Sequence, residues 1–288
     1  MVKISAGSYD LNKWLHGGYE EDIVTVIYGG PGSGKTNFCL LAAVSQAKKG
    51  NKVIYFDTEG GFSVERVKQI VGKVNGGKSD KENVEEVLKN ILLLNPTNFS
   101  EQKKDFDKLA KNLKDEATLI IVDSMTLHYR LDLADAREKS NESSGDVENS
   151  GNWGTSSPES PMDMSRCLRH LEHAQEPRVL DISKRSNPIN RNIHIQKTNS
   201  ELARQIGILG EIARKRNIPV IVTNQIYNWE NGTKMVGGDI LKYWGKCIIE
   251  LVNDGGKRIA YLKKHRSLPE KSLSFQIYDG GIRKKGWI

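Results

Sequence analysis

The sequence predicts an α/β fold in which a mostly parallel sheet is flanked by helices and extended by an antiparallel C-terminal edge. Two observations carry this prediction. From residue 23 onward, short β-branched and aromatic runs alternate with longer stretches of helical periodicity, the pattern of βα units around a parallel sheet. Near the C-terminus, three strand-like runs follow one another without an intervening helix, which is typical of antiparallel strands.

The expected elements follow from these patterns in chain order. Strands are expected at residues 23–28, 52–56, 91–94, 118–122, 220–223, 246–251, 258–262 and 273–278, and helices at residues 36–49, 64–71, 100–113 and 200–216. In the last of these helices, Leu202, Ile206 and Leu209 keep helical spacing. Thr198 followed by Glu201 predicts a capping-box start for that helix, and the residues around Pro219 predict its end.

One stretch departs from this alternation. Residues 133–195 are rich in Ser, Asn, Glu, Gly and Pro and contain one modest apolar segment. A connection of this length without structure of its own is uncommon inside a compact domain. We therefore predict one core formed by residues 1–132 and 196–288, and a low-complexity, flexible insertion at residues 133–195.

Length and composition narrow the class of protein. The chain has 288 residues, of which 37% are hydrophobic and 27% charged, as expected of a globular α/β domain. No apolar run approaches the roughly 20 residues of a bilayer span, and the N-terminus lacks an export pattern, so we expect a cytoplasmic protein with no membrane contact. Three scattered cysteines argue against a disulfide framework.

Positive charge is concentrated at the C-terminal end. The formal net charge is +7, and residues 255–288 alone hold nine basic and two acidic side chains. Clustered cations attract phosphate backbones and release counterions on contact. A solubilising surface would show the same excess, so charge alone leaves nucleic-acid binding and a solvated surface equally open.

The strongest motif is a glycine-rich loop between the first strand and the first long helix. Its glycines allow the backbone N–H groups to wrap a polyphosphate, and the helix start adds partial positive charge. Lys35 is placed to reach the β and γ phosphates, and the Thr36 hydroxyl to ligate Mg²⁺. The sequence therefore predicts binding of a nucleoside triphosphate. The loop consists of Gly29, Gly30, Pro31, Gly32, Ser33, Gly34, Lys35 and Thr36.

Polar side chains follow three further predicted strands. Asp123 ends an apolar strand, where a carboxylate would lie near the metal. Asp57 and Glu59 follow another strand; Glu59 is the better candidate for the base that activates water, and Asp57 for capping the turn. Gln225 follows a third and is placed to hydrogen-bond a γ-phosphate, although an ordinary loop residue would fit the same position.

Together these motifs resemble the RecA superfamily of recombinases, and most closely its archaeal recombinase paralogues. The correspondence covers nearly everything except the predicted insertion, and the motifs come in the family's order. It runs through residues 4–8, 15–18, 29–36, 56–60, 121–126, 198–205, 222–225, 235–241 and 264–270.

The resemblance implies a RecA-like core that binds ATP and Mg²⁺ through the loop at residues 29–36. It implies Glu59 as the water-activating carboxylate, Asp123 near the metal and Gln225 as the γ-phosphate sensor. In this superfamily one DNA-contacting loop follows the strand that ends at Asp123, and a second follows the Gln, here residues 226–236. The candidate DNA-contacting residues are Arg130, Tyr227 and Lys234 in these segments, with Lys263, Lys264 and Arg266 in a region that approaches a neighbouring subunit's nucleotide in recombinase filaments.

The resemblance also implies an ATP-binding, DNA-binding accessory protein of homologous recombination and DNA repair. Its expected partners are single-stranded or branched DNA and recombinase or junction-processing proteins. Because the recognisable core begins almost at Met1 and the loop after Gln225 is short, we expect weak, DNA-independent ATP hydrolysis and no strand exchange. The alternative is a RecA-like signalling ATPase of the circadian-clock type that acts on protein partners.

Overall fold

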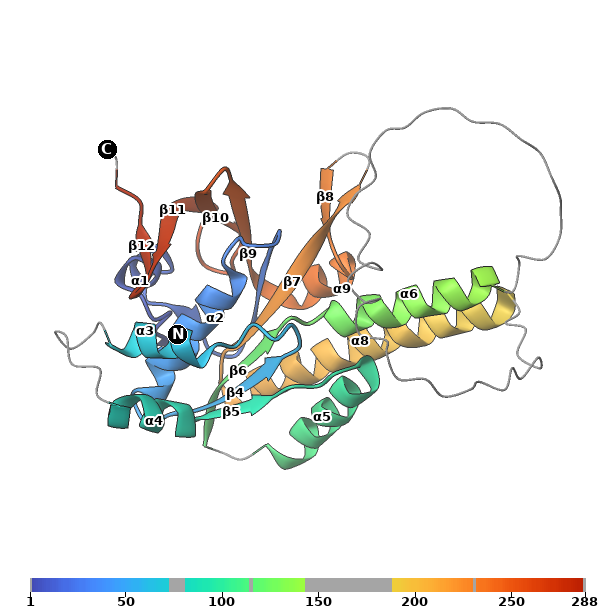
Figure 1. The fold of residues 1–288 in the computed structure, drawn as a ribbon, viewed down its shortest axis with the longest axis horizontal. Coiled ribbons are helices and arrows are strands. Elements are labelled where there is room, and N and C mark those ends of the chain that lie inside the picture. Colours follow the sequence, from blue (N-terminus) through green and yellow to red (C-terminus); the bar gives the residue numbers. More distant parts are fainter. Residues whose placement is uncertain (1, 73–80, 114–115, 143–187, 230–231, 287–288) are drawn as a thin grey trace, which may run out of the picture.

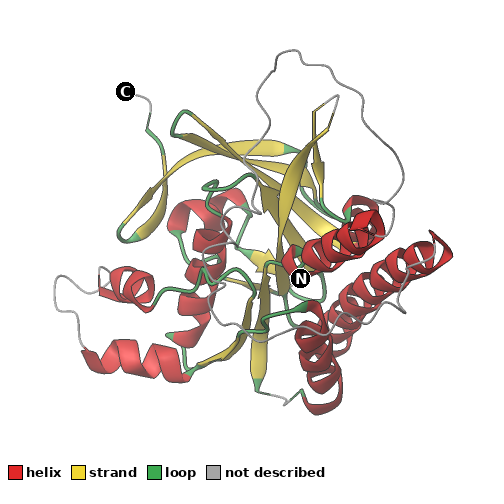
Figure 2. Cartoon of the chain, turned by 45° about the vertical axis from the view of Figure 1, so that its right-hand side comes forward, coloured by secondary structure: helices red, strands yellow, loops and turns green. Residues whose placement is uncertain are grey.

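The structure, a computed structural model, describes residues 2–72, 81–113, 116–142, 188–229 and 232–286. Its centre is a ten-stranded sheet with helices on both faces (Figure 1, Figure 2). The strand order is β12-β11-β10-β9-β3-β7-β6-β4-β5, and β8 pairs with β7 off this path. The strands are β3 (Val24–Gly29), β4 (Lys52–Asp57), β5 (Ile91–Leu94), β6 (Ala117–Asp123), β7 (Val220–Trp229), β8 (Gly232–Met235), β9 (Gly245–Asp254), β10 (Lys257–Lys264), β11 (Lys271–Tyr278) and β12 (Gly281–Lys284), while β1 (Lys3–Ile4) and β2 (Tyr19–Glu20) form a separate two-stranded sheet.

The strand pairing confirms the predicted fold class. Strands β9, β3, β7, β6, β4 and β5 pair in parallel, and β10, β11 and β12 add an antiparallel edge to β9. The register places Gly29 beside Gln225 and Asp57 beside Asp123. Because parallel strands end at the same edge of a sheet, the ends of β3, β4 and β6 meet there. Gln225, which was predicted to follow a strand, lies inside β7 but level with the end of β3.

Both faces of the parallel sheet are buried. Successive strand residues point to opposite faces, so that Val26 packs in one core and Ile27 in the other. This arrangement explains why the strands are nearly continuous Val, Ile and Leu runs rather than alternations of apolar and polar residues. One face is covered by α1 (Tyr9–Trp14), α2 (Lys35–Ala47), α3 (Val64–Gly72) and α4 (Lys81–Lys89), and the other by α5 (Phe99–Asn112), α6 (Leu127–Glu142), α8 (Pro188–Arg216) and α9 (Gly238–Trp244).

The elements predicted before Asp123 are all present, with ends shifted by at most two residues. Their boundaries are set by strong local signals, such as Asn98, whose side chain accepts the N–H of Glu101 and caps α5. The sequence did not predict the two-residue strands β1 and β2, the helices α1, α4, α6 and α9, or the strands β8 and β12. Most of these elements are too short for periodicity to indicate them.

The helix predicted from residue 200 begins at Pro188, and the helix after β6 continues to Glu142. Helical structure therefore enters the predicted insertion, residues 133–195, from both ends, while residues 143–187 lie outside the described residues. The predicted capping box is wrong, because Thr198 lies inside α8 and donates its hydroxyl to Asp132 Oδ2 of α6 at 2.7 Å. The two helices lie side by side (Figure 1), and contacts such as this one, which local sequence does not reveal, stabilise the added turns.

The segment after Gln225, predicted as a loop, is a β-hairpin. Strand β7 continues past Thr223 to Trp229, and β8 returns antiparallel with Tyr227 opposite Lys234. The returning strand is anchored by the buried Asn224, whose Nδ2 donates to Val236 O at 2.8 Å. The sequence has an Asn-Gly dipeptide at residues 231–232, but Gly232 is the first residue of β8 and pairs with Trp229, so the dipeptide is not the two-residue connection of this hairpin.

No helix among the described residues is long and apolar enough to span a bilayer.

Candidate nucleotide and DNA site

The glycine-rich loop connects β3 directly to α2 at the carboxyl edge of the sheet. Gly34 caps α2 with a φ of 109°, a left-handed conformation that favours glycine. At Gly29 an added Cβ would lie 2.2 Å from Leu251 O of β9, so a side chain there would force the two strands apart. The backbone path of the loop therefore depends on glycine, as the phosphate-binding motif requires.

Lys35 is the first residue of α2, and its side chain reaches back to the start of the glycine-rich loop. Its ammonium is largely buried and donates to Gly29 O at 2.9 Å and to Gly30 O at 3.0 Å. Burial lowers the pKa of Lys35, and the carboxylates of Glu59 and Asp123 partly offset this effect. A polyphosphate would supply the negative charge that a buried ammonium needs. Ser33 adds a buried hydroxyl that has no partner among the described residues, so the loop offers unused hydrogen-bonding capacity.

The two residues predicted to hold Mg²⁺ lie together. The carboxylate of Asp123 is buried at the end of β6 and is hydrogen-bonded by the Thr36 hydroxyl. Tyr55 Oη donates to Asp123 Oδ2 at 3.0 Å, and Thr223 Oγ1 donates to Oδ1 at 2.5 Å. Burial has the largest effect and holds the pKa of Asp123 above its usual value. The hydrogen bonds from Thr223, Thr36 and Tyr55 lower the pKa and partly offset this effect. A hydroxyl beside a carboxylate is a donor set that suits a hard cation such as Mg²⁺.

Asp57 and Glu59 follow β4 and have different surroundings. The Asp57 carboxylate accepts the N–H groups of Gly61 at 3.0 Å and Phe62 at 2.9 Å, so it caps the turn, as predicted. Thr58 fixes the middle of the turn, because Ser124 N donates to its hydroxyl at 2.8 Å. Glu59 extends beyond this fixed turn with an exposed carboxylate, which leaves it accessible to a substrate.

Gln225 joins Glu59 to the first turn of α6. Its Nε2 donates to Glu59 Oε1 at 2.8 Å, and its Oε1 accepts from Arg130 NH1 at 2.6 Å. The structure thus brings the predicted base, the predicted γ-phosphate sensor and a predicted DNA-contacting residue into one hydrogen-bonded chain. This chain lies beside the glycine-rich loop, because Gln225 is the register partner of Gly29.

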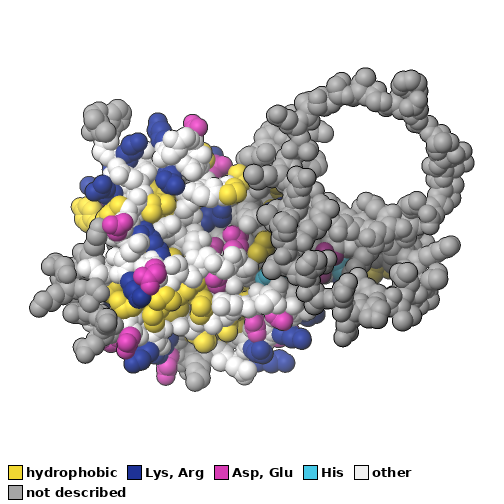
Figure 3. Space-filling model, in the orientation of Figure 1, with side chains coloured by type: hydrophobic (Ala, Val, Ile, Leu, Met, Phe, Trp, Pro, Cys, Tyr) yellow, Lys and Arg dark blue, Asp and Glu magenta, His cyan; other side chains and the backbone are white. Residues whose placement is uncertain are grey.

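The predicted DNA-contacting residues fall into two groups. Tyr227 and Lys234 are opposite each other on the β7–β8 hairpin, and both are exposed. Lys263 and Lys264 are exposed at the end of β10, where Lys264 Nζ donates to Lys242 O at 3.1 Å. Figure 3 shows basic side chains over the C-terminal strands at the upper left, with acidic ones among them.

Arg266 has a different environment from these lysines. Its guanidinium donates to Glu20 Oε2 at 2.6 Å and to Asp22 at 2.7 and 3.0 Å. A contact between Arg266 and DNA would have to break these ion pairs. The sequence contained no signal for this arrangement, because Glu20 and Arg266 lie at opposite ends of the chain.

Two arginines near the loop were not predicted as site residues. Arg258 of β10 donates from Nε to Gly32 O at 3.3 Å. Arg66 of α3 donates to Asn37 Oδ1 at 2.9 Å and to the carbonyl of Tyr278 at 2.9 Å, so it ties α3 to α2 and to the end of β11. These contacts join distant segments, and neither arginine belongs to a local motif.

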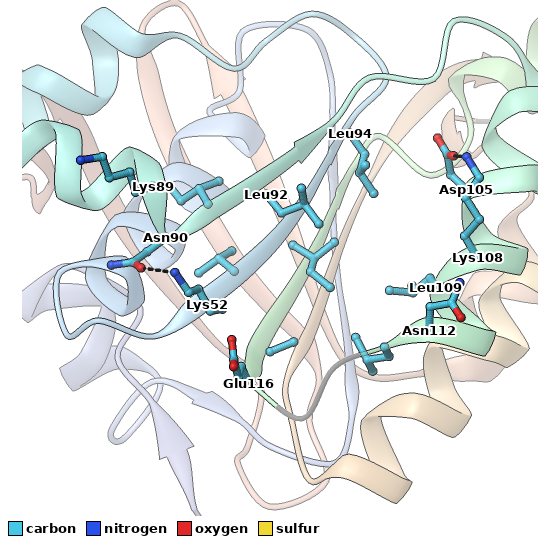
Figure 4. A pocket seen from close by; sticks show the side chains of 15 residues that line it. Lys52, Lys89, Asn90, Leu92, Leu94, Asp105, Lys108, Leu109, Asn112 and Glu116 are labelled. Atoms are coloured by element: carbon cyan, nitrogen blue, oxygen red, sulfur yellow. Dashed lines mark hydrogen bonds and ion pairs between the residues drawn. The ribbon is translucent and has the colours of Figure 1, made fainter.

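A separate cavity of about 520 Å³ lies at the edge strand β5, away from this site. Its walls are mainly apolar, with Leu92, Leu94 and Leu109 among the lining side chains (Figure 4). Figure 3 shows hydrophobic side chains gathered on this face. None of the predicted site residues lines this cavity, so the site rests on the strand ends and not on this concave feature.

Comparisons with known proteins show which family this chain resembles. The Rad51 family model matches residues 1–144 and 186–285. The chain is 33% identical over 272 residues to a DNA repair and recombination protein RadB of Methanocaldococcus jannaschii, covering 94% of this chain and 98% of that protein. A protein of the same name from Methanobrevibacter smithii is 33% identical over 283 residues, covering 94% of this chain and 92% of that protein. A crystal structure of the RadB recombinase superposes with a TM-score of 0.65 at 30% identity and covers 98% of this chain and 100% of that chain.

Proposed function

The chain belongs to the Rad51 family, and on this premise we propose that it is an ATP-binding, DNA-binding accessory protein of homologous recombination and DNA repair. Relatives named DNA repair and recombination protein cover nearly the whole chain, which supports the role in recombination and repair. One observation carries the ATP-binding part. Four segments far apart in sequence place Lys35, Thr36, Asp123, Glu59 and Gln225 at one edge of the sheet.

The loop at residues 29–36 binds the triphosphate of ATP. Its backbone N–H groups and the ammonium of Lys35 hold the phosphates, and the negative charge of the ligand compensates the burial of that ammonium. Thr36 and Asp123 would hold Mg²⁺, which when bound neutralises charge on the phosphates. The amide of Gln225 is placed to hydrogen-bond the terminal phosphate.

Glu59 is the group that accepts a proton from the attacking water. Its carboxylate is exposed, and Gln225 engages one of its oxygens, which leaves the other to accept the proton. We propose weak hydrolysis that does not depend on DNA, and no strand exchange. This expectation is tested by measuring ATP turnover and strand exchange with and without single-stranded DNA.

DNA contacts are assigned to Tyr227 and Lys234 on the hairpin and to Lys263 and Lys264 at the end of β10. An exposed aromatic ring beside a cation is suited to stack on a base and to pair with a phosphate. The part of the hairpin assigned to DNA follows Gln225 directly along β7. Loss of the terminal phosphate of ATP would therefore occur next to the segment that contacts DNA.

The ATP half of the proposal is tested with two substitutions and a control. Lys35→Ala should weaken ATP binding strongly in an equilibrium titration. Glu59→Gln should retain ATP binding and lose turnover by roughly a hundredfold or more, as expected for removal of a general base. Glu65→Gln changes an exposed carboxylate on α3 that pairs with Lys68 among the described residues; it is the matched control and should behave as the wild type. Full turnover in Glu59→Gln would exclude Glu59 as the base.

The DNA half is tested by filter binding across a salt series with single-stranded and branched DNA. DNA affinity should fall steeply as the salt concentration rises. In Lys234→Ala the salt slope, which is the slope of log affinity against log salt concentration, should be smaller by about one unit because one phosphate contact is lost. Lys111→Ala on α5 is the control. Absence of DNA affinity at low salt would remove this half and favour the alternative of a signalling ATPase that acts on protein partners.

A further inference from the structure

The amide of Gln225 lies between a cation and an anion that come from different segments. Arg130 NH1 donates to its Oε1 at 2.6 Å, and its Nε2 donates to Glu59 Oε1 at 2.8 Å. A guanidinium can only donate hydrogen bonds and a carboxylate can only accept them. The two charged neighbours therefore fix which way the amide points, although an isolated glutamine amide has two nearly equivalent orientations.

The backbone that carries Arg130 is itself held in place. Arg130 N donates to Thr126 O at 3.1 Å, and the Thr126 hydroxyl donates to the buried Asn224. One residue earlier, Tyr129 Oη donates to Asn199 Oδ1 of α8 at 2.8 Å. The start of α6 is thus fixed to both β7 and α8, so the guanidinium is presented to Gln225 from a rigid element.

The guanidinium of Arg130 makes its hydrogen bond among the described residues to Gln225. A guanidinium engaged at 2.6 Å with an amide that is polarised by a carboxylate is held more firmly than a solvated surface cation. This observation differs from the sequence-based expectation that Arg130 contacts DNA, because it directs the cation toward the hydrolytic carboxylate.

We propose that Arg130 is a positioning residue for ATP hydrolysis, which acts through the Gln225 amide to hold the Glu59 carboxylate in its working orientation. The inference rests on the proposed function, because it assumes that Glu59 accepts the proton of the attacking water. It also gives a physical reason for turnover without DNA. The contacts that orient Glu59 are all supplied by the chain itself, so a bound strand is not needed to assemble them.

Arg130→Ala is the main test. It should lower kcat by roughly tenfold to a hundredfold, the range that a small misplacement of a reacting group produces, and leave the KM for ATP nearly unchanged. The salt slope of DNA binding should also be unchanged. Arg130→Lys, which keeps a charged donor, should recover part of kcat. Arg204→Ala on α8, where the arginine is paired with Glu201 and Asp107 outside the site, is the matched control and should keep the wild-type kcat.

A double-mutant cycle separates positioning from a general loss of stability. If Arg130 acts through Gln225, the double variant Arg130→Ala/Gln225→Ala should have the same kcat as Gln225→Ala, because the second change removes a contact that no longer exists. Thermal unfolding of each variant with bound ATP shows whether the fold is intact. Independent, multiplicative losses in the cycle would overturn the inference.

The failure of this inference is distinguishable from the failure of the proposed function. If Glu59→Gln keeps wild-type turnover, the proposed role of Glu59 as the base is wrong and the inference falls with it. If Glu59→Gln abolishes turnover while Arg130→Ala keeps the wild-type kcat and reduces the salt slope of DNA binding, Arg130 is a phosphate contact and only the inference is overturned.

Discussion

Arg266→Ala tests whether Arg266 acts in stability or in DNA contact. In the structure its guanidinium bonds Glu20 and Asp22, so it joins the segment after β10 to the turn after β2. The Glu20 side chain is 0% exposed and that of Arg266 is 27% exposed. Removing Arg266 would leave a buried carboxylate with fewer partners, and we expect a loss of folding stability.

The magnitude follows from what remains around Glu20. Removing one partner of a fully buried ion pair costs about 3–5 kcal/mol. Here Lys3 stays at 3.5 Å and the Ser267 hydroxyl at 3.0 Å, and Arg266 is itself partly exposed. We therefore expect about 2–3 kcal/mol, which for a domain of this size lowers Tm by roughly 5–10 °C.

The loss should depend on pH in a defined direction. Burial acts to raise the pKa of Glu20, but the hydrogen bond from Arg266, the charge of His265 and the hydrogen bond from Ser267 outweigh it, so the pKa is lowered. A carboxyl with a lowered folded pKa stabilises the fold above its unfolded pKa and loses that contribution as pH falls through the folded value. The difference between wild type and variant should therefore shrink below about pH 4.

Urea unfolding at pH 7 and pH 3.5 measures both quantities, and filter binding below the Tm of the variant measures DNA affinity. Lys263→Ala, an exposed neighbour on β10, is the matched control and should unfold as the wild type does. If Arg266→Ala unfolded as the wild type but lost about one unit of salt slope in DNA binding, the ion-pair role would be refuted and the DNA contact supported.

Three further outcomes are expected. ATP affinity should fall by up to tenfold per pH unit as the pH rises through the pKa of Lys35, because the phosphates bind the protonated ammonium and burial has lowered that pKa from 10.5. Isothermal titration calorimetry between pH 7 and 10 measures this change in affinity. Lys35→Arg should show no such dependence on pH. Gly29→Ala should lose about 1–3 kcal/mol of stability in urea, because its Cβ would meet Leu251 O at 2.2 Å; Gly30→Ala, whose nearest contact would be 3.9 Å away, should lose far less. Asn224→Ala should lower the free energy of unfolding by about 2–4 kcal/mol, because buried groups lose their partners. Amide hydrogen exchange should show faster opening of the β7–β8 hairpin. Unchanged protection of the hairpin would contradict the anchoring role of Asn224.

Where the local signal was strong, the sequence predicted the structure well. The strand, glycine loop and helix around Lys35 were located within two residues, because the spacing of the glycines and the apolar strand before them leave few alternatives. The predicted capping role of Asp57 is confirmed, and the role of Glu59 as the base stays a prediction.

Where contacts with a distant element decide the structure, the prediction was wrong. Thr198 and Glu201 satisfy a capping box, yet Thr198 lies inside a longer helix because Asp132 of α6 takes its hydroxyl. Residues 226–236 were expected as a loop from the family resemblance, whereas β8 pairs with β7 in the structure. In both cases pairing with a second element decided the outcome.

The sequence by itself determined the fold class, the glycine-rich loop and the strand ends near Asp123 and Glu59, because hydrophobic periodicity and glycine spacing are local properties. It placed Gln225 after a strand, whereas the structure places this residue inside β7. The tertiary structure alone decided that Arg130 bonds Gln225 and that Arg266 bonds Glu20. An arginine can donate to any acceptor within reach of its long side chain, and which acceptor that is depends on residues about 95 and 246 positions away in the chain. Such pairings become visible only when the strands have been brought together.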